Sequence, residues 1–151
     1  ELAQVAQDAF NDPLVTMLNN SPQVSQVVVG GGAIPPGSSD TYNITAEGRF
    51  RKLSLVTMLV NTNDGFTGRS KIQLPRHGTK TYYLRTYDAG TEKNTELATH
   101  IPGPCCGHPF EGIPEHRRIR FHRGIKGIGD LDPAVYGWDD PVAKLTIARV
   151  N

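Results

Sequence analysis

The sequence is poor in three features that would narrow its class at once. Its two cysteines are adjacent, at Cys105 and Cys106, so they cannot join distant elements in a disulfide framework. No run approaches the roughly 18 apolar residues of a membrane-spanning helix, and no segment has the pattern of a signal peptide, so any export signal would already be removed. Sixteen basic against fifteen acidic residues leave a net charge of +1, which supplies no general attraction for nucleic acid or an anionic membrane.

Glycine and proline, by contrast, are abundant. Sixteen Gly and eleven Pro separate short apolar runs, a composition that favours strands and turns over a helical bundle. A chain of 151 residues fits one domain and can bury roughly two thirds of the surface that its unfolded form exposes. We therefore expect residues 1–151 to form a single domain with one core.

Helical spacing of apolar residues occurs only at the start of the chain. It predicts a short helix from Leu2 to Phe10, and a second one with Pro13 at its first helical position. Apolar or alternating runs then predict about seven strands, at residues 26–29, 41–45, 53–60, 71–74, 79–86, 117–122 and 143–147. Residues 92–115 form a long polar loop. The irregular spacing of these seven predicted strands, without a repeat, favours an antiparallel β-sandwich with short N-terminal helices.

Two of the predicted strands end in segments rich in oxygen atoms. The buried strand at 53–60 continues into Asn61–Gly68, which contains Asp64, and the aromatic strand at 79–86 continues into Tyr87–Glu92, which contains Asp88 and Glu92. Calcium takes six to eight oxygen ligands, which loops at one end of a sandwich can supply together. The same three acids also suit ordinary turns, so a calcium site and a set of turn residues both remain open from the residues alone.

Three stretches together resemble the spondin domain: residues 61–68, 87–92 and 141–150. The similarity is closer to bacterial secreted members, which also show stretches like residues 124–133, and it covers nearly the whole chain. The resemblance implies an extracellular β-sandwich, similar in architecture to calcium- and phospholipid-binding sandwich domains. It also implies a calcium site built by Asp64, Asp88 and Glu92, with Glu92 standing where animal members carry Asp.

The chain departs from this family in two places. Bacterial relatives carry an additional segment, with a first β-strand, ahead of the helix that begins near Leu2. A sandwich without that strand has an open edge, so we expect a strand to be supplied by another copy of the chain or by a cleaved piece of its precursor. Repeated exchange between copies would give a filament. The relatives are also richer in histidine around residues 120–127, where this chain retains His122.

A second hypothesis comes from a different chemistry. Cys105, Cys106 and His108, with His122 as a possible further ligand, have the donor types for zinc or copper. Adjacent cysteines wrap one ion poorly, because their side chains diverge on an extended backbone, so surface thiols or a strained vicinal disulfide is the competing interpretation. A metal-handling or redox protein is thus the alternative function.

No order of serine, histidine and acid, no glycine-rich phosphate loop and no paired general acid and base stands out, so we do not predict an enzyme. The leading hypothesis is a secreted or cell-surface, calcium-binding β-sandwich used in adhesion, matrix or surface assembly. The expected partner is an extracellular or surface protein, with no nucleic acid.

Overall fold

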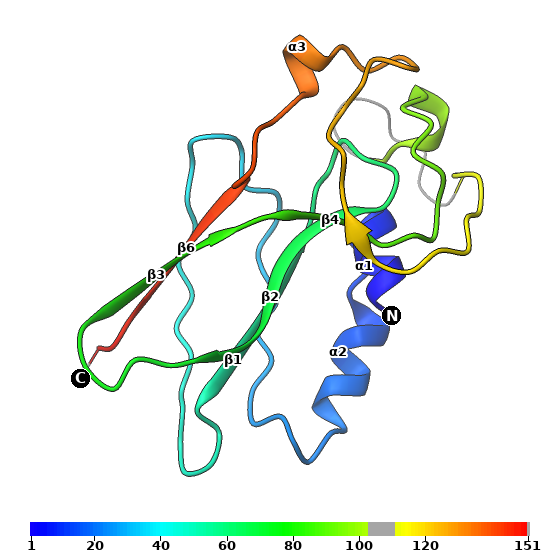
Figure 1. Cartoon of the computed structure of the whole chain (residues 1–151). Helices are drawn as coiled ribbons and strands as arrows, with labels where there is room; N and C mark the ends of the chain where they lie inside the picture. The colour runs from blue at the N-terminus through cyan, green and yellow to red at the C-terminus, as the bar shows by residue number, and fades with distance from the viewer. Residues whose placement is uncertain (103–110, 151) are drawn as a thin grey trace.

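The computed structural model describes residues 1–102 and 111–150, and its regular elements are short (Figure 1). Two helices open the chain, and a third helix and a 3-10 turn occur later. In chain order the elements are α1 (Leu2–Asp8), α2 (Asp12–Asn19), β1 (Lys52–Met58), β2 (Gly65–Gln73), β3 (Thr79–Leu84), β4 (Thr86–Asp88), η1 (Ala98–His100), β5 (Arg120–Phe121), α3 (Pro133–Tyr136) and β6 (Ala143–Ala148). No helix in these ranges is long and apolar enough to cross a membrane.

The strands form two antiparallel sheets. One sheet has four strands in the order β1-β2-β4-β5, and the other pairs β3 with β6 along six residues. The chain passes from one sheet to the other at Arg85, the residue between β3 and β4. The prediction of a mainly-β chain with short N-terminal helices is therefore confirmed in this coarse form.

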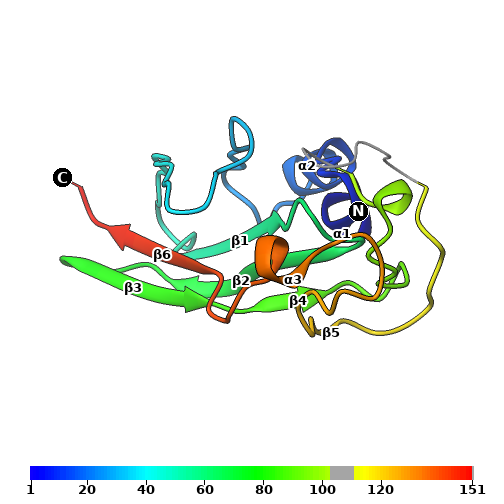
Figure 2. The same ribbon diagram turned by 90° about the horizontal axis from the view of Figure 1, so that it is seen from above.

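Helix α1 covers one end of the four-stranded sheet. Its buried residues Val5 and Ala6 face the sheet, and Ala6 packs in a core cluster with Phe66 of β2 and Ala89. Figure 2 shows α1 and α2 on the same side of this sheet. A second core cluster lies under the long loops, where Ile101, Ile125 and Leu131 are buried together against Tyr136 and Trp138. The loop ends that carry the predicted acids lie beside the first cluster.

Several predicted strand boundaries were wrong. The run at 79–86 is two strands in different sheets, and β2 begins at Gly65, inside the segment expected to be a loop. Of the run at 117–122, only Arg120 and Phe121 pair as a strand. Residues 26–29 and 41–45 form no strand, because their main chains make no hydrogen bonds to another main-chain segment in the described part of the chain. The second predicted helix is present, but it begins at Asp12, so Pro13 is its second residue and not, as predicted, its first.

Candidate functional site

The connection between β1 and β2 is a tight hairpin that the side chain of Thr62 closes. Its hydroxyl donates to Leu59 O over 2.6 Å and accepts the main-chain N–H of Gly65 over 2.9 Å. A Cβ atom at position 65 would overlap with this hydroxyl, so the turn requires glycine there. Gly65 pairs with Asp88 of β4. This register places Asp64, one residue before Gly65, next to the end of β4.

Asp64 is fully buried, and its two carboxylate oxygens have different surroundings. Oδ2 accepts the main-chain N–H groups of Thr91 (2.6 Å) and Glu92 (2.9 Å) and the Thr91 hydroxyl (3.0 Å). Oδ1 is buried without a hydrogen-bond partner among the described residues. Burial raises the pKa of Asp64, and the nearby charge of Asp88 raises it further, while the hydrogen bonds oppose both effects. Oδ1 therefore marks a position where a cation or a proton would be stabilising.

Asp88 ends β4, and both of its carboxylate oxygens are engaged. Oδ1 accepts the main-chain N–H of Gly90 over 2.7 Å. Oδ2 accepts the side-chain amide of Asn94 over 2.6 Å and lies 2.8 Å from Arg120 Nη2 of β5. The guanidinium of Arg120 thus balances the charge of Asp88, whereas Asp64 has no such cation beside it in the described residues.

Glu92 places a third carboxyl group at the same end of the sheet. Its side chain is packed so closely against Gly112 that a Cβ atom there would overlap with the carboxylate. Burial is the largest cause that raises the pKa of Glu92 from 4.5 to about 7, and the charges of Asp64 and Asp8 add to it. Asp8 is the last residue of α1, so the first helix contributes a fourth acid to this acid cluster of Asp8, Asp64, Asp88 and Glu92.

Two buried side-chain amides carry further oxygen atoms, one three residues before Asp64 in the sequence and one beside Asp88. Asn61 Oδ1, in the β1–β2 hairpin, and Asn94 Oδ1, whose amide group contacts Asp88, are both buried without a hydrogen-bond donor among the described residues. Carboxylate and amide oxygens are the donors that calcium prefers, so the chemistry of the site fits that ion. In residues 1–102 and 111–150, however, no group of three His, Cys, Asp or Glu side chains is arranged to hold a metal ion. The convergence of Asp64, Asp88 and Glu92 on one ion stays a prediction.

His122 is buried one residue after β5. Its Nδ1 accepts the main-chain N–H of Gly124 over 3.0 Å, and its ring centroid lies 5.2 Å from that of Trp138. Burial lowers the pKa of His122 below its usual value, so the ring is neutral at pH 7. The other residues of the soft-metal alternative lie outside the described residues: Cys105, Cys106 and His108.

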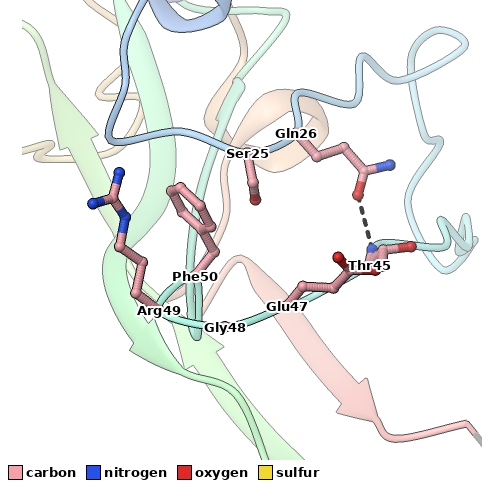
Figure 3. Close-up of a pocket in the computed structure, with 7 residues that line it drawn as sticks. All are labelled: Ser25, Gln26, Thr45, Glu47, Gly48, Arg49 and Phe50. Atoms are coloured by element: carbon pink, nitrogen blue, oxygen red, sulfur yellow. Dashed lines mark hydrogen bonds between the residues drawn. The ribbon is translucent and has the colours of Figure 1, made fainter.

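A second candidate site is the hollow between two extended segments near the start of the chain (Figure 3). It has a volume of about 630 Å³ and is lined by Ser25, Gln26, Thr45, Glu47, Gly48, Arg49 and Phe50. The side chain of Gln26 crosses it, because its Oε1 accepts the main-chain N–H of Thr45 over 2.8 Å. Further along the two segments, the Tyr42 hydroxyl accepts the N–H of Gly31 over 3.3 Å. Side chains rather than main-chain hydrogen bonds therefore connect these segments.

Sequence reasoning found the three acids but missed the residues that surround them. Arg120 reaches Asp88 only because β5 pairs with β4 in the register that sets these two residues opposite each other. Asn63 ties the hairpin to the loop after β4, since its Oδ1 accepts the main-chain N–H of Thr95 over 3.1 Å. An Asn before an Asp in a turn gives no sign of such a distant partner. Comparison with protein-family models, curated proteins and solved structures found no match to this chain.

Proposed function

We propose that the protein is an exported β-sandwich domain of the spondin kind that binds calcium at the acid cluster and acts in adhesion or in assembly at a cell surface or in a matrix. One observation carries the proposal. Asp64 Oδ1 is completely buried and has no donor among the described residues, while Asp88 and Glu92 are buried as well, and the charge of Asp64 interacts with the charges of both.

The charges around Asp64 support a bound cation. The charges of the four carboxyl groups of the acid cluster act on one another. Arg120 forms an ion pair with one of them, Asp88. Arg120 is shared, because its Nη2 also lies 2.7 Å from Glu115 Oε2. The remaining negative charge at Asp64 and Glu92 must be balanced by protons or by an ion. A divalent cation compensates both carboxylates at neutral pH, where protonation is incomplete.

Hard oxygen donors at this end of the sheet are the proposed ligands. Asp64 Oδ1 supplies one ligand, Glu92 a second, and Asp88 a third when its carboxylate turns from Asn94. The buried amide oxygens of Asn61 and Asn94 are further candidates. Calcium accepts this mixture of carboxylate and amide oxygens in irregular geometry, whereas magnesium requires a nearly ideal octahedron.

Assembly is supported by the hollow of Figure 3. In residues 25–46 the structure describes a single main-chain hydrogen bond, from Ser38 N to Pro35 O, so most N–H and C=O groups of these extended segments have no main-chain partner there. Five large apolar residues of this stretch are between 40% and 51% exposed: Val28, Val29, Ile34, Tyr42 and Ile44. A β-strand of a second copy would form hydrogen bonds with these unpaired main-chain groups. Because paired strands lie about 4.8 Å apart, the added strand would also cover the five exposed apolar side chains.

Calcium binding is tested by thermal unfolding in calcium, in magnesium and in chelator, combined with calorimetric titration. Saturation to about 100 times the dissociation constant adds about 2.7 kcal/mol to the free energy of unfolding, which raises the melting temperature by roughly 5–10 °C. The titration should show one calcium per chain. Equal melting temperatures in calcium and chelator, with no heat of binding, would contradict the proposal.

The Asp64→Asn variant makes the test specific. The amide oxygen can still accept the N–H groups of Thr91 and Glu92, but the negative charge beside Asp88 is gone. The variant should therefore be at least as stable as the wild type in chelator and should gain nothing from calcium. Asp139→Asn serves as the control, because Asp139 is an exposed acid outside the acid cluster.

A further inference from the structure

The edge of the four-stranded sheet at residues 117–123 carries cations and apolar side chains together. Ile119 and Phe121 are 53% and 52% exposed. Three exposed arginines flank them in the sequence: Arg117, Arg118 and Arg123. We call these five residues the basic edge. Phe121 belongs to β5, the outer strand of the sheet, so the basic edge lies at the rim of the molecule (Figure 2).

The positive charge of the basic edge is only partly balanced. Arg117 Nε lies 2.8 Å from Glu115 Oε1, so these two charges pair. Arg118 and Arg123 form no ion pair in the described part of the chain. A fourth arginine, Arg85, adjoins the edge, because its guanidinium carbon lies 4.1 Å from the centroid of the Phe121 ring. Its Nε lies 3.5 Å from Asp140 Oδ2, so the unbalanced charge is that of Arg118 and Arg123. A local excess of positive charge thus exists in a chain whose net charge is only +1.

Within the basic edge, the Phe121 ring is fixed by stacking on the aromatic residues of the neighbouring strands. The Phe121 ring stacks on Tyr87 with 5.4 Å between centroids, and Tyr87 stacks in turn on Phe66 at 5.5 Å. Phe66 is buried in the core cluster with Ala6. This ladder of three rings crosses β2, β4 and β5, so the exposed portion of Phe121 projects from a fixed support.

We propose that the basic edge docks on an anionic phospholipid surface. Arginine pairs with lipid phosphates, and exposed apolar side chains between the arginines enter the boundary between headgroups and acyl chains. A soluble polyanion would satisfy the arginines equally well, but it would leave Ile119 and Phe121 in water. The interleaving of half-exposed apolar residues with unpaired cations therefore favours the lipid surface.

Vesicle flotation tests this proposal directly. The full chain is mixed with vesicles of equal parts phosphatidylglycerol and phosphatidylcholine, or of phosphatidylcholine alone, always in the presence of chelator. We expect binding to the anionic vesicles only, because each cation near such a surface strengthens partitioning by about fivefold. Reversal of one charge, in Arg118→Glu or Arg123→Glu, should weaken binding by at least that factor, and Ile119→Ser should remove the fraction that persists at high salt.

Matched controls separate docking from general charge and from instability. Lys144→Glu reverses an exposed charge on β6, and Val150→Ser removes an exposed apolar side chain near the end of the described chain. Both should bind like the wild type. The proposal is overturned if the chain does not bind anionic vesicles in chelator, if the control charge reversal weakens binding equally, or if a soluble sulfated polysaccharide binds while vesicles do not. Because chelator is present throughout, failure here leaves the calcium proposal standing.

Discussion

The main-chain N–H of Glu92 donates to Asp64 Oδ2 over 2.9 Å, so two acids that lie 28 residues apart in the sequence are fixed side by side. This hydrogen bond stabilises one oxygen of Asp64, while the other is buried without a hydrogen-bond partner among the described residues. The arrangement concentrates negative charge where β2 begins and β4 ends. The site is therefore expected to respond to both protons and cations.

The first prediction concerns pH. The pKa of Glu92 is raised in the folded protein from 4.5 to about 7, so the folded state holds this proton more tightly than the unfolded state. In chelator, the contribution of Glu92 is fully present below its unfolded pKa and is lost as pH rises from about 4.5 to about 7, by an amount of up to roughly 3 kcal/mol. Thermal unfolding measured in chelator from about pH 5 to about pH 8 checks this loss.

Glu92→Gln supplies the control for the pH prediction. The neutral amide cannot titrate, so this component of the pH dependence should disappear in the variant. Calcium should also protect the wild type increasingly as pH rises, because the ion and the proton compete for the same carboxyl group. A calcium effect that is larger at about pH 5 than at about pH 8 would be inconsistent with Glu92 as a ligand.

The second prediction concerns Arg120. Its removal in Arg120→Met leaves the buried charge of Asp88 without a cation, which should lower the free energy of unfolding by about 2–4 kcal/mol, with allowance for the partial exposure of the arginine. Calcium should recover part of this loss. Chemical denaturation of Arg117→Met, which breaks only the surface pair with Glu115, should show a change below about 1 kcal/mol.

The third prediction concerns assembly through the hollow beside residues 25–46. Proline at position 28 removes a main-chain donor that a strand from a second copy would use, so Val28→Pro should shift the protein toward monomer. His77→Pro, in the exposed loop between β2 and β3, is the control and should assemble like the wild type. Light scattering over a range of concentrations measures both. A wild-type chain that stays at 16.5 kDa at every concentration would rule out self-assembly.

The fourth prediction separates the two metal hypotheses. A double serine variant of Cys105 and Cys106 should fold normally and retain calcium binding, because the surrounding glycines and prolines predict a loop without a fixed ligand set. Elemental analysis of the wild type and the variant checks the metal content. Loss of a stoichiometric zinc or copper ion in the variant would favour the metal-handling alternative instead.

Sequence reasoning succeeded where a short pattern determines the structure and failed where partners are distant. A nearly continuous apolar run identified β1 and alternation identified β6, each to within two residues at each end, and the apolar spacing near Leu2 identified α1. Residues 26–29 have the β-branched composition of a strand, but a strand exists only where a neighbour offers main-chain hydrogen bonds. The break at Arg85 also escaped the sequence, because a continuous aromatic run contains no sign that the chain changes sheets there.

The candidate site divides in the same way. Asp64, Asp88 and Glu92 lie in or near segments that were predicted to follow strands, and their placement at one end of a sheet was a reasonable expectation from their positions. The contribution of Asp8 depends on how α1 packs on the sheet, and that of Arg120 depends on the register of β5. Neither contact can be read from local patterns, since both join residues more than 30 positions apart.

A crystal structure of the protein grown in calcium, with an anomalous difference map, tests the central claim most directly. The account predicts one anomalous peak about 2.3–2.6 Å from Asp64 Oδ1, with Glu92 and Asp88 or its amide neighbours completing the coordination, and no peak in crystals grown in chelator. A map without a peak, in which Asp64 Oδ1 instead shares a proton with the Glu92 carboxyl group in calcium, would contradict it.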